Sequence, residues 1–129
     1  TCVQLGRRLC TEVEWEKACK GPRETVFPYG ADFAPAICNT ADSAGAGKPV
    51  AASGRFEKCG SGYEVFDMSG NLREWTGSEI SEGNLAKVIK GGSAVQPDWA
   101  TRCAYRDFAM PDKPPFLTGF RCCKSIQAD

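Results

Sequence analysis

Two carboxylates bracket a tight turn in the stretch DMSGNLREW, residues 67–75. Asp67 and Glu74 lie seven positions apart, and Ser69-Gly70-Asn71 between them would break a helix. The chain must therefore fold the two acids around a Gly-Asn corner. Carboxylates and turn carbonyls are the oxygen donors that hold a hard cation such as Ca²⁺. The residues alone leave a second interpretation open, in which Asp67 caps the turn and Glu74 forms a salt bridge.

The chain has eight cysteines and no histidine, and both counts limit the chemistry it can perform. The absence of histidine excludes Ser-His and Cys-His nucleophile pairs and His-ligated metal sites within this chain. No CxxC pair occurs, so a four-cysteine zinc site is disfavoured. An even number of irregularly spaced cysteines favours disulfides formed in an oxidising compartment. Spacing alone leaves on the order of a hundred pairings open.

One segment carries a clear helical pattern. In CTEVEWEKACKGP, Thr11 and Glu14 form a capping box, in which each side chain satisfies a backbone N–H of the first turn. An apolar stripe starts at Trp15, and Gly21-Pro22 stops the pattern. These signals predict a helix over 12–20.

The remaining segments predict short strands and much irregular backbone. Apolar residues alternate in GYEVF before the turn, KVIK is β-branched and ends at a Gly pair, and TRCAYRDFA and TGFRCC alternate like half-buried strands. Residues 28–56 are rich in Gly, Ala, Pro, Asp and Ser and predict ordered loop. An α+β fold of this kind needs cross-links or bound ions to hold its loops.

The length and the net charge of the chain limit the possible number of domains and the possible classes of partner. A chain of 129 residues fits one domain, spanning 1–129. Sixteen Lys and Arg balance sixteen Asp and Glu, so no global field favours nucleic acid. No apolar run approaches the roughly 18 residues of a membrane span.

Seven motifs follow one another in a fixed order: GRRLCTEVEWEKACKGP, FPYG, CNTAD, GYEVFDMSGNLREWTGS, VIKGGS, RCAYR and GFRC. In type and order they resemble the formylglycine-generating-enzyme-like (sulfatase-modifying factor) family, over nearly the whole chain. The resemblance implies a variant C-type-lectin fold, α+β, with little regular secondary structure. Family members carry a further stretch before the first motif, so 1–129 resembles the C-terminal part of a single domain that lacks its usual N-terminal portion.

The resemblance also implies bound calcium. In the family, the DMSGNLREW turn wraps the ion, which assigns Asp67, Glu74 and the carbonyls of Gly70 and Leu72 as ligands, while Asn71 shapes the turn. Six to eight oxygens are the coordination that Ca²⁺ prefers.

A second calcium site of the family would start at Asn39-Thr40, with Asp42 as an addition. The loop that holds it is shorter here than in the catalytic members of the family.

Two disulfides of the catalytic relatives match cysteines of this chain. They imply the pairs Cys19–Cys103 and Cys2–Cys122.

The other four cysteines are expected to pair as Cys38–Cys59 and Cys10–Cys123. The first bridge would close a loop across the Gly/Ala-rich segment. The second would lie beside Cys2–Cys122, since neighbouring residues on a strand point to opposite faces. The sequence leaves the pairing of these four open.

The resemblance also indicates which residues copper-dependent catalysis would need. The catalytic relatives oxidise a substrate cysteine with a copper ion held by two thiols between GGS and RCxxR. Here that segment is AVQPDWAT, with Gln96 at the first thiol position, and Arg73 replaces a catalytic tryptophan. An amide cannot replace a thiolate for Cu(I). We therefore expect a non-catalytic member; a copper-dependent formylglycine-generating oxidase is the alternative.

The loops after GGS and around RCAYR would line the former active-site cleft, so a non-catalytic member would bind its ligand there. Tyr, Trp and Arg concentrate interface energy. In the alternative interpretation, Trp99 and Phe108 are core and Arg106 satisfies buried carbonyls. The candidate ligand-binding residues are Gln96, Trp99, Tyr105, Arg106, Asp107 and Phe108.

Together these observations predict a secreted or cell-surface binding module, hardened by disulfides and loaded with calcium. The expected partner is another protein or the N-terminal portion of the same domain. Glycan binding is a weaker alternative, because a lectin-like fold does not imply sugar recognition. A third class is a structural module within a larger surface assembly.

Overall fold

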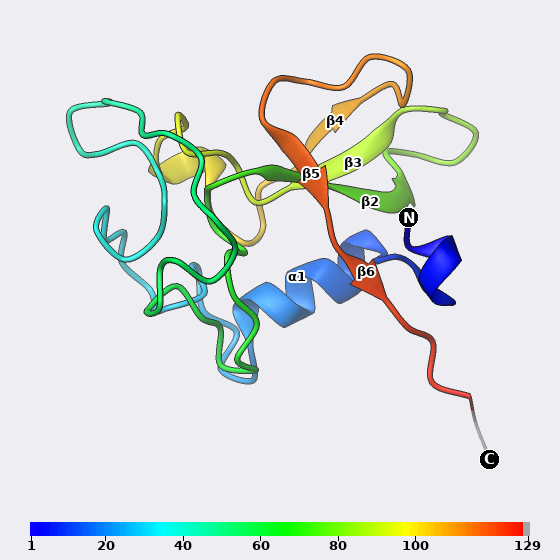
Figure 1. Cartoon of the computed structure of the whole chain (residues 1–129), viewed down its shortest axis with the longest axis horizontal. Coiled ribbons are helices and arrows are strands. Elements are labelled where there is room, and N and C mark those ends of the chain that lie inside the picture. The colour runs from blue at the N-terminus through cyan, green and yellow to red at the C-terminus, as the bar shows by residue number, and fades with distance from the viewer. Residues whose placement is uncertain (128–129) are drawn as a thin grey trace.

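A computed structural model describes residues 1–127 and shows one α-helix, six short strands and long irregular connections (Figure 1). In chain order the elements are the 3-10 turn η1 (Val3–Leu5), β1 (Arg8–Leu9), α1 (Glu12–Lys20), β2 (Arg73–Glu79), β3 (Lys87–Lys90), the 3-10 turn η2 (Asp98–Ala100), β4 (Asp107–Ala109), β5 (Thr118–Phe120) and β6 (Cys122–Cys123).

The helix α1 has the bounds and the cap that the sequence predicts. The Thr11 side chain accepts from the Glu14 N–H, and the Glu14 carboxylate accepts from the Thr11 N–H, which completes the capping box. Trp15 and Cys19 are buried on the face that packs against β2 and β3. Gly21, with φ of 68°, follows the last turn.

A four-stranded mixed sheet in the order β4-β3-β2-β5 forms the second layer, above α1 in Figure 1. β2 and β3 are antiparallel, β3 and β4 are antiparallel, and β5 runs parallel to β2. A separate pair, β1 with β6, brings the two ends of the described chain together. The result is a mixed sheet with one helix and a framework of disulfides.

Two strand predictions differ from the structure. The longest strand, β2, begins at Arg73, directly after a segment that the sequence pattern marked only as a turn. Residues 62–66, predicted as a strand, form no strand and contribute one isolated bridge between Gly60 and Phe66. Residues 62–66 form a mostly exposed loop in which only Val65 packs against the core, whereas β2 pairs with two distant strands, β3 and β5.

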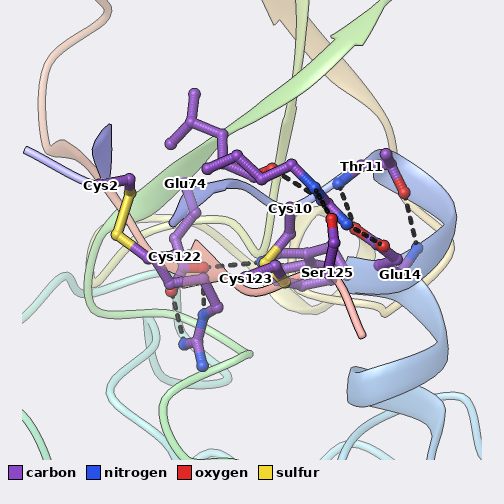
Figure 2. Close-up of a disulfide and its surroundings, with 12 residues drawn as sticks. Cys2, Cys10, Thr11, Glu14, Glu74, Cys122, Cys123 and Ser125 are labelled. Atoms are coloured by element: carbon purple, nitrogen blue, oxygen red, sulfur yellow. Dashed lines mark hydrogen bonds and ion pairs between the residues drawn. A yellow bond between two sulfur atoms is a disulfide. The ribbon is translucent and has the colours of Figure 1, made fainter. Parts of the chain in front are cut away.

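Four disulfides hold this framework together. They join Cys19 to Cys103 and Cys38 to Cys59, and all four pairs are those expected above. The other two, Cys2–Cys122 and Cys10–Cys123, lie side by side where β1 meets β6 (Figure 2). Four bridges in a chain of this length indicate an oxidising compartment.

The core is small and partly made of sulfur. Its buried cluster consists of Trp15, Met68 and the cysteines at positions 10, 19 and 103. Loops thus depend on covalent bridges and side-chain hydrogen bonds more than on apolar burial. Within residues 1–127, no helix has the length and apolar character that crossing a membrane requires.

Candidate functional site

Asn71 is the centre of the turn between the two acids. Its backbone adopts φ of 64°, and its side-chain Oδ1 accepts from Asn39 Nδ2 and from the Ala51 N–H, both at 2.9 Å. Its Nδ2 donates to the Ala51 carbonyl, while its own N–H donates to the Asn39 carbonyl. The Asn71 carbonyl accepts from the Ala94 N–H after the GGS motif. Asn71 therefore ties three separate segments together, in keeping with a turn-shaping role.

Gly70 is required by space as well as by conformation. A Cβ at this position would lie 2.2 Å from the Asn39 carbonyl oxygen, and the backbone has φ of 78°. The Gly70 N–H donates to the Gly91 carbonyl at 2.7 Å. The turn thus packs directly on the Asn39 backbone and on the Gly pair.

Asp67 and Glu74 line the same cavity, of about 260 Å³, together with Leu72 and Arg121. Asp67 has a left-handed backbone, with φ of 58°, and its Oδ2 accepts from the Gly54 N–H at 2.7 Å. The structure therefore brings the two bracketing carboxylates together, as the sequence pattern suggested.

The Glu74 carboxylate is almost fully buried and already has three donors. Arg121 binds it in a two-point fork, with Nε to Oε2 at 2.6 Å and Nη2 to Oε1 at 2.7 Å. Trp15 Nε1 of α1 donates to Oε2 at 2.7 Å. Figure 2 shows Glu74 beside the two terminal disulfides. Glu74 thus joins the helix, the central strand and the C-terminal segment.

The oxygens of this turn fit a calcium ion in part. In the part of the chain that the structure describes, no hydrogen bond reaches the carbonyl oxygens of Gly70 and Leu72. Glu74, by contrast, is engaged by Arg121, so a cation would share or compete for it. Residues 1–127 contain no group of three or more His, Cys, Asp or Glu side chains that could hold a metal ion. A calcium ion here would depend largely on Asp67 and backbone carbonyls.

The second expected calcium position adjoins the first. Asn39 and Gly70 form an isolated parallel bridge. The Asn39 side-chain amide donates to the Pro49 carbonyl and to Asn71, and the buried Thr40 hydroxyl donates to the Ala41 carbonyl. Asp42 folds its own loop, because Oδ1 accepts from the backbone N–H groups of residues 44 and 46. All three side chains have structural partners here.

The structure brings together two of the six candidate ligand-binding residues. The Trp99 and Tyr105 rings meet edge to face with centroids 5.4 Å apart, and Trp99 is 48% exposed. Phe108, on the edge strand β4, is 57% exposed. These exposures do not support the alternative interpretation, in which Trp99 and Phe108 are core.

The other three candidates turn toward separate partners. Arg106 forms an ion pair with Glu12 of α1 and donates to the Ile80 carbonyl. Asp107 lies 3.5 Å from Arg73, the residue at the former tryptophan position. The Gln96 carbonyl accepts from the Ala41 N–H, and its side-chain Oε1 is buried without a hydrogen-bond partner. The six residues therefore form one aromatic pair and several local contacts.

Sequence reasoning left Trp15 and Arg121 out of the site, although both bind Glu74. A buried carboxylate needs a cation and hydrogen-bond donors, and the sequence left open that Glu74 forms a salt bridge, without naming its partner. Their identity depends on the return of β5 and the C-terminal segment beside β2, which no local pattern shows.

Comparison with known sequences decides the family. Residues 2–126 match the sequence profile described as the sulfatase-modifying factor enzyme 1-like domain. The chain belongs to this family. The resemblance noted from the seven motifs is thereby confirmed.

Curated members of the sulfatase-modifying factor family include active and inactive proteins. The chain is 29% identical to the mouse formylglycine-generating enzyme, covering 94% of this chain and 40% of that protein. It is 30% identical to the mouse "inactive C-alpha-formylglycine-generating enzyme 2", covering 96% of this chain and 45% of that protein. The chain thus spans less than half the length of these curated relatives.

Solved structures share the fold. Variable protein 1 of Treponema denticola superposes with a TM-score of 0.76 at 23% identity, covering 92% of this chain and 48% of that one. PvdO from Pseudomonas aeruginosa superposes with a TM-score of 0.74 at 22% identity, covering 92% and 55%. At this identity the likeness concerns architecture alone.

Proposed function

We propose that this chain is a non-catalytic, extracellular binding module of the sulfatase-modifying factor family, with another protein as its partner. One observation carries the proposal. All eight cysteines lie within the described residues and all are joined in disulfides, which leaves no free thiol there.

Copper chemistry of the kind that the family resemblance implies needs two thiolates in the segment after GGS. That segment holds Gln96 and no cysteine, and amide oxygen is a poor ligand for Cu(I). Arg73, at the former tryptophan position, is held by Asp107 and by the Phe116 carbonyl. A relative named as inactive, 30% identical to this chain, gives a non-catalytic member a precedent in the family.

The aromatic pair Trp99–Tyr105 is the surface that best suits a protein partner. Large, rigid, amphipathic rings give much contact area at low entropic cost and are enriched where interface energy concentrates. Phe108, on β4, and Phe116 are also exposed. A protein partner is therefore favoured over a glycan at this aromatic surface. The proposal includes a variant C-type-lectin fold, which is compatible with either kind of partner.

Calcium is part of the proposal as a structural ion. Asp67 and the carbonyls of Gly70 and Leu72 would hold it, and its charge would stiffen the turn between the two acids. Thermal unfolding followed with calcium and with a chelator measures this role. Calcium should raise the melting temperature of the natural chain more than that of Asp67→Asn, whereas equal shifts would refute calcium binding by Asp67.

The decisive experiment on catalysis is a thiol count joined to an activity assay. Thiol titration of the denatured, unreduced chain should find no free thiol. The chain loaded with Cu(I) should convert no cysteine to formylglycine in a sulfatase-type peptide, with the mouse enzyme as the positive control. Two or more free thiols together with conversion would establish the oxidase.

The binding surface is tested separately. Secreted proteins from the source organism are captured on the immobilised chain and on two variants, Trp99→Ser and Leu85→Ser. Leu85 is 68% exposed in the β2–β3 connection and serves as a matched apolar control. Loss of the same captured proteins with Trp99→Ser, and their retention with Leu85→Ser, is expected. Equal retention by both variants would exclude Trp99 from the interface.

A further inference from the structure

A second cavity, of about 530 Å³, lies between the end of α1 and the loop at 58–62. Figure 1 shows this loop turning beside the C-terminal end of α1. The lining residues are Lys20, Pro22, Arg23, Thr25, Pro28, Tyr29, Gly30, Lys58, Gly60, Ser61 and Gly62. None of them belongs to the acidic turn or to the Trp99–Tyr105 surface, so this cavity is separate from both.

The charged residues that line this cavity are all cations. Lys20, Arg23 and Lys58 contribute to it, and no carboxylate does. Within residues 1–127, neither Arg23 nor Lys58 has an ion-pair partner, and Lys20 has only a distant one, Glu16 at 3.8 Å. The chain is neutral as a whole. Three cations line this hollow and no carboxylate does, so the local field is positive and favours an anion, although the Glu24 carboxylate near Lys20 offsets part of it.

Two hydroxyls at the same cavity have protons to donate. Tyr29 Oη accepts from the Ala34 N–H, and the nine-tenths buried Ser61 Oγ accepts from the N–H groups of Tyr63 and Val65. Both oxygens act as acceptors in these bonds, and within the described chain neither hydroxyl proton has an acceptor. Burial raises the pKa of Tyr29, as does the charge of nearby Asp98, and the hydroxyl keeps its proton at neutral pH. Asp98 does not line the cavity, but its charge reduces the positive field on the Tyr29 side.

The carbonyl that could repel an anion here is already used. A helix C-terminus carries partial negative charge on its last carbonyls. The Lys20 carbonyl, however, accepts from the Thr25 N–H, while the Thr25 hydroxyl is closer to the Phe27 carbonyl. The cavity therefore offers a ligand mainly donors.

Close backbone packing sets the shape of the hollow. Gly21 and Gly62 meet so closely that a Cβ on Gly21 would lie 3.0 Å from the Gly62 nitrogen, and a Cβ on Gly62 would lie 2.7 Å from the Pro22 ring. This contact fixes the 58–62 loop against the end of α1. Lys58 is thereby held at the same cavity as Lys20 and Arg23 although it lies far from them in sequence.

We propose that this cavity binds a sulfate or phosphate ester carried on a sugar-sized body. Three cations and two hydroxyl donors match the oxygens of a tetrahedral oxyanion, for which charge-assisted hydrogen bonds are the strongest type. The volume of about 530 Å³ exceeds what a bare oxyanion fills and lies within the range of small-ligand sites. Tyr29, Pro22 and Pro28 supply flat apolar area for the body of the ligand.

The test is an NMR titration of the isotope-labelled full chain with glucose 6-sulfate and, separately, with glucose 6-phosphate. Either ester should shift the amide signals of Gly30, Gly60 and Gly62, and added salt should weaken the binding. The ester that binds more tightly identifies the source as a sulfated or a phosphorylated ligand. Unesterified glucose, which lacks the anionic group, is the control and should leave these amide signals unshifted.

Variants make the assignment specific. Arg23→Gln and Lys58→Gln should each weaken ester binding about tenfold, as expected for one lost charge-assisted bond. Lys113→Gln removes an exposed lysine outside the cavity and should leave the affinity unchanged. The proposal is overturned if neither ester shifts these glycines, if glucose binds equally well, or if Lys113→Gln weakens binding as much as the cavity variants do.

Discussion

The two parts of this molecule fix irregular backbone by different means. The helix–sheet region, residues 1–20 and 73–127, holds α1, all six strands and three disulfides. The loop region, residues 21–72, holds one disulfide and only isolated bridges. Side chains such as Asn71 and Asp42 take the place of ladders there. Ordered loops thus need no regular structure, provided that their backbone groups find specific partners.

Backbone conformation shows the same contrast. Within residues 1–127, four of the five non-glycine residues with positive φ, at positions 24, 64, 67 and 71, lie in the loop region. Such conformations are unfavourable unless neighbouring contacts enforce them. The acidic turn and the cationic cavity both draw residues from this region, whereas the Trp99–Tyr105 surface lies in the helix–sheet region. Two of the three candidate sites therefore depend on backbone that side-chain contacts, not strand pairing, fix.

The largest expected effect comes from the disulfides. Replacing Cys19 and Cys103 by alanine should cost about 4.5 kcal/mol, and replacing Cys38 and Cys59 about 3 kcal/mol, because loop-closure entropy grows with the length of the closed loop. The separations are 84 and 21 residues. Urea unfolding measures both costs. A larger cost for the loop-region bridge would reverse the ranking of the two regions.

The buried ion pair tests the helix–sheet region next. Arg121→Met leaves the Glu74 carboxylate buried without its cation and should destabilise the fold by about 3–4 kcal/mol. The double variant with Glu74→Gln should recover part of this loss, because the uncompensated charge is gone. Arg102→Met, at an exposed arginine that donates to the Trp99 carbonyl, is the control. Thermal or urea unfolding of the natural chain, Arg121→Met, Glu74→Gln, the double variant and the control measures the coupling between Arg121 and Glu74, which should be absent if Arg121 acts by packing alone.

Asn71→Ala tests the loop region in the same way. It removes three side-chain hydrogen bonds and leaves the partners on Asn39 and Ala51 unsatisfied, at a cost of about 2–3 kcal/mol. Asn84→Ala, which loses one part-buried bond from the Ala86 N–H to its side chain, is the matched control. Hydrogen exchange should show the loss of protection concentrated in the loop region. A uniform loss over the whole chain would mean that the two regions unfold as one unit.

The smallest effect concerns pH. The two-point hydrogen bond from Arg8, with the N–H of Thr11, lowers the pKa of Glu14 from 4.5 to about 2. A carboxyl with a lowered folded-state pKa adds stability above its unfolded value, and this stability disappears as pH falls toward about 2. Because Glu14 is 41% exposed, the contribution is about 1 kcal/mol after solvent screening.

Glu14→Gln should therefore be less stable than the natural chain at neutral pH and equal to it near the folded pKa. Urea midpoints measured across the acid range give the comparison. A constant difference at all pH values would assign the effect of the substitution to the helix cap and not to the ion pair.

Local sequence patterns predicted the elements whose signals lie entirely within one short segment. The helix over 12–20 rests on signals between Thr11 and Pro22, and the structure has it at the same bounds. The strands near VIK, RDFA and TGF were found for the same reason. β2 was missed because its ladder depends on two segments that return from later in the chain.

The sequence by itself determined the family, the helix and a cysteine framework that could close the loops. The tertiary structure alone decided that Arg121 reaches Glu74 and that Lys58 lies at one cavity with Lys20 and Arg23. Residue types and short spacings are properties of the chain, and local hydrogen bonding expresses them directly. Contacts between side chains far apart in sequence depend on how the loops close. Here disulfides and close glycine contacts between distant segments determine that closure.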